Sequence, residues 1–319
     1  MLTIDEALTL SQELTLSTLK TSKVKLGQVT SYLSDKTGKG LRSHLLITCA
    51  SNPEGLVHPD AAKAAAAIEI LHLATLIHDD VIDDSDTRRG HPSVHKQFDT
   101  KTAVICGDYL LAVSLSLLSD IDHTRLDAPE AHKPLAPKMI NALSSLAKGE
   151  FLQHLNIGNV DIDFFTYLKI ISGKTAALFY LAAYTGAFLA NETPKDCKHI
   201  GTFGQFIGMA FQISDDCKDY EWSIADAGKP VTIDAQNGVM SLPVILAIQK
   251  DATLKPLLKT LTPATLPHFI QQVIALGGTS SAVVISKKYA KKAEKQLTNL
   301  EENKKKRLLA LTKRLRAGV

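Results

Sequence analysis

Two acidic clusters with the same spacing are the residues of this sequence best suited to chemistry. Both have the pattern Asp-Asp-x-x-Asp; their members are Asp79, Asp80 and Asp83, and Asp215, Asp216 and Asp219. On a helix, the first and last aspartates of this pattern share a face. Each cluster ends an apolar run, where carboxylates are costly to bury without a cation. Hard oxygen ligands favour Mg²⁺, which bridges to substrate phosphates, so two facing clusters would fit Mg²⁺ ions that hold a diphosphate.

Cations follow these clusters or lie in short glycine-containing segments. They are Arg88, Arg89, Lys39, Arg42, Lys174 and Lys229. Arginine suits bidentate contact with phosphate, and lysine acts as a point charge. Because the cations alternate with carboxylates that repel a polyanion, the pattern favours a metal-bridged diphosphate over nucleic acid.

Helices must position both sets of residues. The run 61–84 is rich in Ala, Leu and Ile without internal Gly or Pro, which favours a helix and is too long for a strand. On that helix His72 lies two turns before Asp79 and shares its face. Further helical patterns cover residues 3–20, 41–50, 101–118, 133–155, 164–189, 194–220, 239–249, 263–275, 279–300 and 303–315. No alternating strand pattern occurs, so we predict an all-α protein with a single domain over residues 1–319.

The composition is typical of a folded cytoplasmic protein. Hydrophobic residues make up 45% and charged residues 22% of the sequence, and the net charge is +3. The apolar stretch 176–190 is shorter than the roughly 20 residues of a membrane span, so we interpret it as a buried helix. Scattered cysteines and an acidic N-terminus predict reduced thiols and no secretion signal. The basic segment 287–319 is interpreted either as a solvated helix face or as a contact for anionic lipid.

In the order and spacing of its motifs, the sequence resembles the trans-isoprenyl diphosphate synthases (polyprenyl synthetases) of medium- or long-chain type. The matching segments are GKGLR, ILHLATLIHDDVIDDSDTRRG, VICGDYLLA, GEFLQ, ISGKTAALF, GQFIGMAFQISDDCKD, GKP and NGVMSLPVI, within residues 38–245. The doubled acidic pattern followed by Arg-Arg-Gly is highly specific. The resemblance implies a bundle of long antiparallel helices around a deep apolar cavity, with the acidic motifs facing each other at its mouth.

The resemblance also implies roles for single residues. The ligands of three Mg²⁺ ions per active site would be Asp79, Asp83 and Asp215, assisted by Asp80, Asp216 and Asp219. The residues that hold the allylic diphosphate would be Arg88, Lys174 and Lys229. Those that hold isopentenyl diphosphate would be Lys39, Arg42, His72 and Arg89. Thr175 and Gln212 would lie against the reacting allylic carbon, where their oxygens stabilise positive charge.

The implied reaction is a prenyl transfer. The allylic diphosphate ionises, the double bond of isopentenyl diphosphate attacks the cation, and a proton is lost to the released diphosphate. Mg²⁺ and the cations stabilise the departing group, and a dry cavity excludes water. In the family, aromatic residues just before the first acidic motif stop chain growth. Because Ala74 and Thr75 are small, we expect a trans-polyprenyl product of twenty carbons or longer from a geranyl, farnesyl or geranylgeranyl primer.

Some positions depart from the family pattern. Ser43 replaces a usual proline, Lys218 replaces an apolar residue inside the second motif, and Val239 replaces a lysine of many members. Family members are mostly dimers, so we expect a homodimer; the alternative is a catalytic subunit active only in a heterodimer. A class I terpene cyclase would share the first motif but lack the second motif and the cations Lys39 and Arg42.

Overall fold

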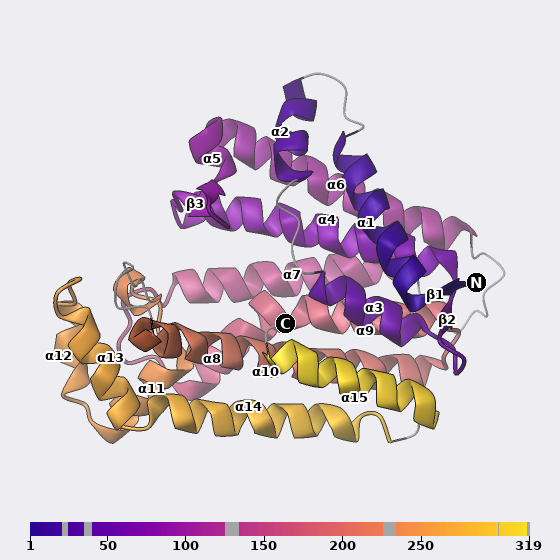
Figure 1. The fold of residues 1–319 in the computed structure, drawn as a ribbon. Coiled ribbons are helices and arrows are strands. Elements are labelled where there is room, and N and C mark those ends of the chain that lie inside the picture. Colours follow the sequence, from indigo (N-terminus) through magenta and orange to yellow (C-terminus); the bar gives the residue numbers. More distant parts are fainter. Residues whose placement is uncertain (21–24, 35–39, 125–133, 226–233, 299, 318–319) are drawn as a thin grey trace. The chain divides into compact units, whose positions relative to one another are not determined.

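The computed structural model describes residues 1–20, 25–34, 40–124, 134–225, 234–298 and 300–317 (Figure 1). The helices are α1 (Ile4–Lys20), α2 (Lys25–Ser34), α3 (Leu41–Ala50), α4 (Pro59–Ile82), α5 (Val94–Gln97), α6 (Thr100–Thr124), α7 (Leu135–His154), α8 (Phe164–Ile171), η1 (Ser172–Ala176), α9 (Ala177–Leu189), α10 (Pro194–Ala225), η2 (Asp234–Asn237), α11 (Leu242–Lys250), α12 (Leu254–Lys259), α13 (Leu266–Ala275), α14 (Gly278–Lys295) and α15 (Glu302–Ala317). Two antiparallel pairs of two-residue strands join β1 (Leu2–Thr3) to β2 (Leu56–Val57) and β3 (Thr87–Arg88) to β4 (His91–Pro92). The predicted all-α class is confirmed.

The helices divide between two compact units. The first comprises residues 1–140, 181–201 and 299–311, and the second comprises residues 141–180, 202–298 and 312–319. Helices α7, α9, α10 and α15 contribute residues to both units. The single domain over the whole chain stays a prediction.

Helix α4 is the central element of the first unit. Its N-terminus is capped, because the His58 side chain accepts a hydrogen bond from the Asp60 N–H and Pro59 occupies the first turn. Its first half carries buried alanines on several sides, which let neighbouring helices approach closely. Helices α6, α1 and α3 pack against it, and Figure 1 shows α4 and α6 side by side. One core cluster of this unit contains Leu19, Val29, Leu33, Ile70, Ala74, Ile77, Val94, Ala103, Cys106 and Leu110.

The second unit has its own core. Helix α11 packs against α14, α13 and α8, and the largest fully buried side chains of its core cluster are Tyr220 and Phe269. This unit carries the second acidic motif on α10. The core therefore fixes the helix on which those carboxylates lie.

The apolar stretch 176–190 is a buried helix, as predicted, since residues 181–189 of α9 are all buried. Helix α6 contains a stretch, Thr100–Ile121, that is apolar and long enough to cross a membrane by length and composition, a property that core helices share. All four cysteines are buried and free.

The helices predicted from the sequence differ from the observed ones in two ways: some observed helices were not predicted, and one predicted helix is divided. Helices α2, α5 and α12 lie outside the predicted runs. Helix α2 contains Gly27, Val29 and Thr30, which are weak helix formers, yet Val29 and Thr30 are buried, so packing outweighs local propensity. The predicted helix 164–189 divides into α8, the π-helical turn η1 and α9.

Candidate active site

The first acidic motif lies at the carboxyl end of α4, in the first unit. The helix ends at Ile82, so Asp83, predicted inside it, is instead the C-cap residue; its N–H donates to the Asp79 carbonyl oxygen at 2.8 Å. Asp84 has a φ of 47°, in the left-handed region, which ends the helix and which aspartate tolerates. Carboxylates at this end oppose the helix dipole and need nearby cations to stabilise them.

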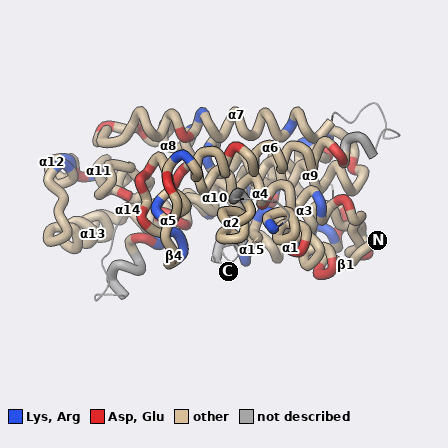
Figure 2. The backbone as a smooth tube through the Cα atoms, turned by 90° about the horizontal axis from the view of Figure 1, so that it is seen from above, with Lys and Arg blue, Asp and Glu red and all other residues tan. Residues whose placement is uncertain are grey.

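Arg88 supplies one such cation. Its Nε lies 2.7 and 2.8 Å from the two Asp80 carboxylate oxygens, and its Nη2 lies 2.6 Å from Oδ1. Arg88 lies opposite α4 because Arg89 (φ 53°) and Gly90 (φ 79°) form the tight turn of the β3–β4 hairpin. Asp80 is buried and paired with Arg88; its expected role in support of the metal ligands stays a prediction. Around α5 and β4, acidic and basic segments lie close together (Figure 2).

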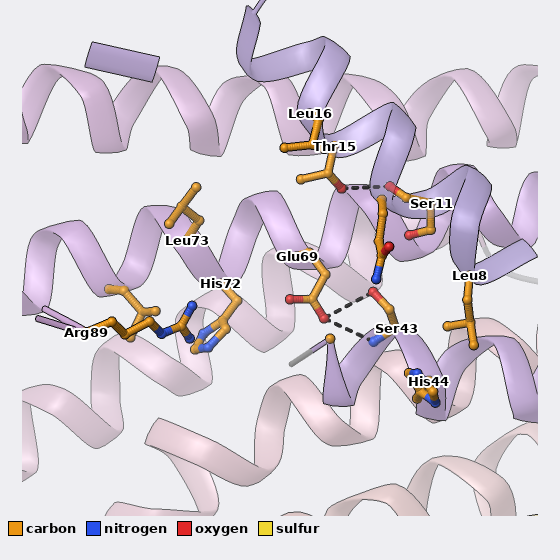
Figure 3. Close-up of a pocket in the computed structure, with 13 residues that line it drawn as sticks. Leu8, Ser11, Thr15, Leu16, Ser43, His44, Glu69, His72, Leu73 and Arg89 are labelled. Atoms are coloured by element: carbon orange, nitrogen blue, oxygen red, sulfur yellow. Dashed lines mark hydrogen bonds between the residues drawn. The ribbon is translucent and has the colours of Figure 1, made fainter. Parts of the chain in front are cut away.

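A cavity of about 180 Å³ in the first unit holds part of the predicted isopentenyl diphosphate site (Figure 3). His72 and Arg89 line it, together with side chains of α1 and α3. Burial lowers the pKa of His72 well below its ordinary value, and the charges of Arg42, Arg89 and Arg88 lower it further. His72 is therefore neutral at pH 7 and can donate one N–H. The structure thus brings Arg42, His72, Arg88 and Arg89 together; Lys39 lies outside the described residues.

The two residues predicted to set product length are buried on α4. Ala74 is inaccessible to solvent and belongs to the core cluster of the first unit. Thr75 is also buried, and its hydroxyl donates to the His72 carbonyl oxygen at 2.8 Å. Leu73 and Leu76, rather than these two residues, line the described cavity. Control of product length by Ala74 and Thr75 therefore stays a prediction.

The second acidic motif lies on α10 in the second unit. Burial raises the pKa of Asp216 to about 6. Burial also raises the pKa of Asp219 to about 7, with further increases from the charges of Asp234, Asp216 and Asp215. Asp215 is more open, with 54% of its side chain exposed, and Lys218 Nζ lies 3.9 Å from its Oδ1. These carboxylates repel one another and would be stabilised by an added cation.

A chain of hydrogen bonds joins the predicted catalytic groups of this unit. Thr175 Oγ1 donates to Gln212 Oε1 at 2.7 Å, and Gln212 Nε2 donates to Asp216 Oδ1 at 2.8 Å. The Tyr167 hydroxyl donates to the other Asp216 oxygen at 2.7 Å. Thr175, Gln212 and Asp216 were predicted to belong to the site. Tyr167 was missed, because an aromatic residue in an apolar helical run resembles a core residue.

Lys174 lies on the π-helical turn η1, a geometry that is frequent at functional sites. Its Nζ is 3.0 Å from Glu150 Oε2 on α7. The two backbones approach so closely that a Cβ on Gly149 would lie 2.4 Å from the Lys174 nitrogen, and one on Gly173 would lie 2.5 Å from the Ser145 carbonyl oxygen. Two glycines therefore permit the contact that positions Lys174. Glu150 was not predicted as a site residue, although it lies in the matched segment GEFLQ.

The donor set of the two motifs fits a hard divalent cation. Within the residues that the structure describes, no three His, Cys, Asp or Glu side chains converge to hold a metal without other ligands. Mg²⁺ usually takes one or two carboxylates and completes its shell with water and substrate phosphates. The buried Asp216 and the partly buried Asp219, both with raised pKa values, match that need. Lys229, predicted beside the second motif, lies outside the described residues.

An all-α protein with clustered aspartates and nearby arginine and lysine side chains has the features expected of a prenyltransferase. The model of the family described as polyprenyl synthetase matches residues 23–273. Heptaprenyl diphosphate synthase component 2 of Bacillus subtilis is 33% identical over 250 residues, covering 77% of this chain and 69% of that protein. The geranyl-diphosphate-specific all-trans-nonaprenyl-diphosphate synthase of Rhodobacter capsulatus is 36% identical, with coverage of 81% and 74%.

Solved structures agree with this relationship. A polyprenyl synthase from Caulobacter crescentus, complexed with calcium and isoprenyl diphosphate, has a TM-score of 0.85 at 26% identity and covers 99% of this chain and 98% of that chain. The chain belongs to the polyprenyl synthetase family. The resemblance noted from the sequence motifs is therefore confirmed, and the chain is a prenyltransferase.

Proposed function

We propose that this chain condenses isopentenyl diphosphate with geranyl, farnesyl or geranylgeranyl diphosphate to form a trans-polyprenyl diphosphate of twenty carbons or longer. The observation that carries the proposal is the group of three arginines, Arg42, Arg88 and Arg89, around the neutral His72, one of which pairs with Asp80 of the first acidic motif. A metal-bridged diphosphate needs both signs of charge in one place. The relatives named as heptaprenyl and nonaprenyl diphosphate synthases support the same reaction.

Magnesium is the cation that we assign to the acidic motifs. Three ions per active site would be held by Asp79, Asp83 and Asp215, with Asp216 and Asp219 assisting. Bound Mg²⁺ supplies positive charge that offsets the charge developing on a departing diphosphate. The calcium in the related Caulobacter crescentus structure supports a divalent cation in this fold.

Side chains of the second unit orient oxygens for the reacting carbon. Because Asp216 accepts from the Gln212 amide nitrogen, the Gln212 carbonyl oxygen faces Thr175 and accepts from its hydroxyl. The remaining lone pairs on these two oxygens can stabilise positive charge on the allylic carbon. The allylic C–O bond breaks first and leaves a cation and free diphosphate. The double bond of isopentenyl diphosphate then forms a C–C bond to this cation, and one of its protons passes to the released diphosphate.

Product analysis tests this reaction. The purified chain is incubated with Mg²⁺, labelled isopentenyl diphosphate and farnesyl diphosphate, and the prenyl products are separated by chain length. We expect more than twenty carbons, because no aromatic ring stands at Ala74 or Thr75. A product of twenty carbons would keep the reaction and place the barrier to growth elsewhere. No product with any of the three primers would contradict an enzyme active on its own.

We expect the active form to be a homodimer. Helix α6 exposes Val104 (39%) and Ile105 (53%), and apolar side chains on a surface favour association. The second candidate is a heterodimer, favoured by the printed name of the Bacillus subtilis relative, component 2. Light scattering of the purified chain and of Ile105→Glu, with activity measured in parallel, separates the two. A dimer that is active alone supports the homodimer; an inactive monomer supports the heterodimer.

We also propose that the enzyme is cytoplasmic and makes a peripheral contact with anionic membrane. At this contact it would release its product. Part of the basic segment is unavailable for it: Lys304 is buried and lies 2.7 Å from Glu192, and Arg307 donates to the Asn52 and Pro53 carbonyl oxygens. The lysines exposed to solvent lie on α14 instead; they are Lys287, Lys288, Lys291, Lys292 and Lys295.

Vesicle binding tests this contact. Removal of residues 303–319 would also break the Lys304 ion pair, so charge reversal on α14 is the cleaner change. Lys287, Lys291 and Lys295 share one helix face, and their replacement by Glu is expected to abolish co-sedimentation with phosphatidylserine vesicles. Unchanged binding would remove α14 from the proposal.

A further inference from the structure

Helix α3 carries Arg42, and its N-cap residue supplies no side-chain cap. Its N-cap residue is Gly40, and no side chain of the N-cap residue accepts a hydrogen bond from the first turn. Free N–H groups at a helix start need an acceptor. The cap comes from another helix: Glu69 Oε1 of α4 accepts from both the Ser43 N–H and the Ser43 hydroxyl, each at 3.1 Å (Figure 3).

Glu69 also sits beside the cations predicted to bind isopentenyl diphosphate. It is three residues before His72 on α4 and lines the same cavity as His72 and Arg89. The Arg42 guanidinium is buried, which lowers its pKa, and the charge of Glu69 opposes that effect. A carboxylate next to an anion site would repel the ligand unless other groups engage it. Here the carboxylate engages Ser43 and offsets the charge of Arg42.

We propose that Glu69 is a positioning residue for isopentenyl diphosphate, because it caps α3 from the adjacent helix α4 and fixes the turn that carries Arg42. The inference rests on the proposed function for the identity of the ligand. Glu69 does not touch the diphosphate in this account; it acts through Arg42 and Ser43. A residue that only stabilised the fold would change the melting temperature without a selective effect on this one substrate.

Three variants separate the parts of this role. Glu69→Ala removes both the cap and the charge. Glu69→Gln keeps an oxygen that accepts from the Ser43 N–H but removes the charge next to Arg42. Ser43→Ala keeps the N–H bond to Glu69 and removes the hydroxyl, with its bond to Glu69 and its longer contact (3.4 Å) with the Ala65 carbonyl oxygen. The matched control is Glu13→Gln, which alters an exposed carboxylate on α1.

The primary measurement is the Kd of isopentenyl diphosphate by calorimetry, with the Kd of farnesyl diphosphate and the melting temperature measured on the same samples. For Glu69→Ala we expect the Kd of isopentenyl diphosphate to rise on the order of tenfold, because charge-assisted bonds are lost. Glu69→Gln should raise it about threefold and Ser43→Ala no more than about twofold. The Kd of farnesyl diphosphate should stay within about twofold of wild type, and Glu13→Gln should match wild type.

Two results would overturn the inference. One is a folded Glu69→Ala protein with unchanged affinity for isopentenyl diphosphate, and the other is an equal loss of affinity for both diphosphates. If Glu69→Ala does not fold, the same criteria apply to Glu69→Gln. Binding is separable from turnover: a wild-type protein that binds isopentenyl diphosphate but makes no product contradicts the proposed function, while the affinities of the variants still decide the role of Glu69. A wild-type protein without such binding contradicts both.

Discussion

The two acidic motifs share one sequence pattern and differ in their electrostatics. In the first, Asp80 is buried and receives three close contacts from the Arg88 guanidinium. In the second, Asp216 is buried with neutral donors from Tyr167 and Gln212, and its pKa is raised to about 6. The first motif therefore carries its own counter-charge, whereas the second retains protons near neutral pH.

This difference shows that the spacing of carboxylates does not determine their charge state. The first motif is followed by a hairpin that returns a guanidinium to the end of α4. Among the residues that the structure describes, the cation paired with the second motif is Lys218, whose Nζ lies 3.9 Å from the exposed Asp215 carboxylate. A bound divalent cation should therefore stabilise the carboxylates of the second motif more than those of the first.

Loss of one carboxylate from each motif gives the largest expected effect. Asp79→Ala and Asp215→Ala should each lower kcat/KM on the order of 10³-fold at saturating Mg²⁺, because both motifs are proposed to stabilise the departing diphosphate. Steady-state assays with farnesyl diphosphate measure this, and Asp86→Ala, at an exposed position, is the control. Near-normal activity in Asp215→Ala alone would mean that the second motif is not part of the machinery.

Removal of the counter-charge should have the next largest effect, and on stability. Arg88→Ala leaves Asp80 buried without its partner and should lower the free energy of unfolding by about 3 kcal/mol. Urea denaturation at pH 7 measures it. Arg89→Ala, at the neighbouring exposed position, should cost less than about 1 kcal/mol. Equal losses in the two variants would show that the contrast between the motifs has no energetic basis.

The sequence predicts the positions of the site residues along their helices but not how their charges pair. Helical periodicity places His72 and Asp79 on one face of α4, and the motifs identify most of the cations. The pairing of Arg88 with Asp80 depends on the turn at Arg89, where a non-glycine residue takes a positive φ, and periodicity contains no sign of it.

The division of residues 164–189 could not be predicted either, because the contact between Gly173 and α7 is non-local. In isolation the segment has the apolar, alanine- and leucine-containing pattern of one helix. Only the packed structure shows that η1 interrupts it and that Glu150 meets Lys174. Residues that act through distant partners are therefore the ones that sequence reasoning missed.

Protons and Mg²⁺ should compete for the carboxylates of the second motif. Because the pKa of Asp219 is raised to about 7, this carboxyl is mostly protonated at pH 6 and mostly ionised at pH 8. The Mg²⁺ concentration for half-maximal rate should therefore rise about tenfold from pH 8 to pH 6. Initial rates across a Mg²⁺ series measure it, and Asp219→Asn should flatten the dependence. An equally steep dependence in that variant would locate the titrating group elsewhere.

The smallest expected effect concerns stability without metal. An aspartate of the unfolded chain titrates near pH 4, whereas Asp219 in the folded protein has a pKa of about 7, mainly because of burial. Between these values the folded state binds more protons than the unfolded state, so the free energy of unfolding falls as the pH rises. Asp219→Asn removes this cost and should stabilise the metal-free protein by about 1 kcal/mol at pH 8 and not at pH 4, since water screens a partly exposed carboxylate.

A carboxyl with the opposite shift provides the control. Hydrogen bonds from Thr253 lower the pKa of Asp251, so Asp251→Asn should lose stability above about pH 4 instead of gaining it. Thermal unfolding in EDTA at both pH values measures the two variants, and added Mg²⁺ should restore more stability to wild type than to Asp219→Asn. If Asp219→Asn were destabilising at pH 8 in EDTA, the second motif would already be neutralised without metal, and it would resemble the first motif in charge as well as in sequence.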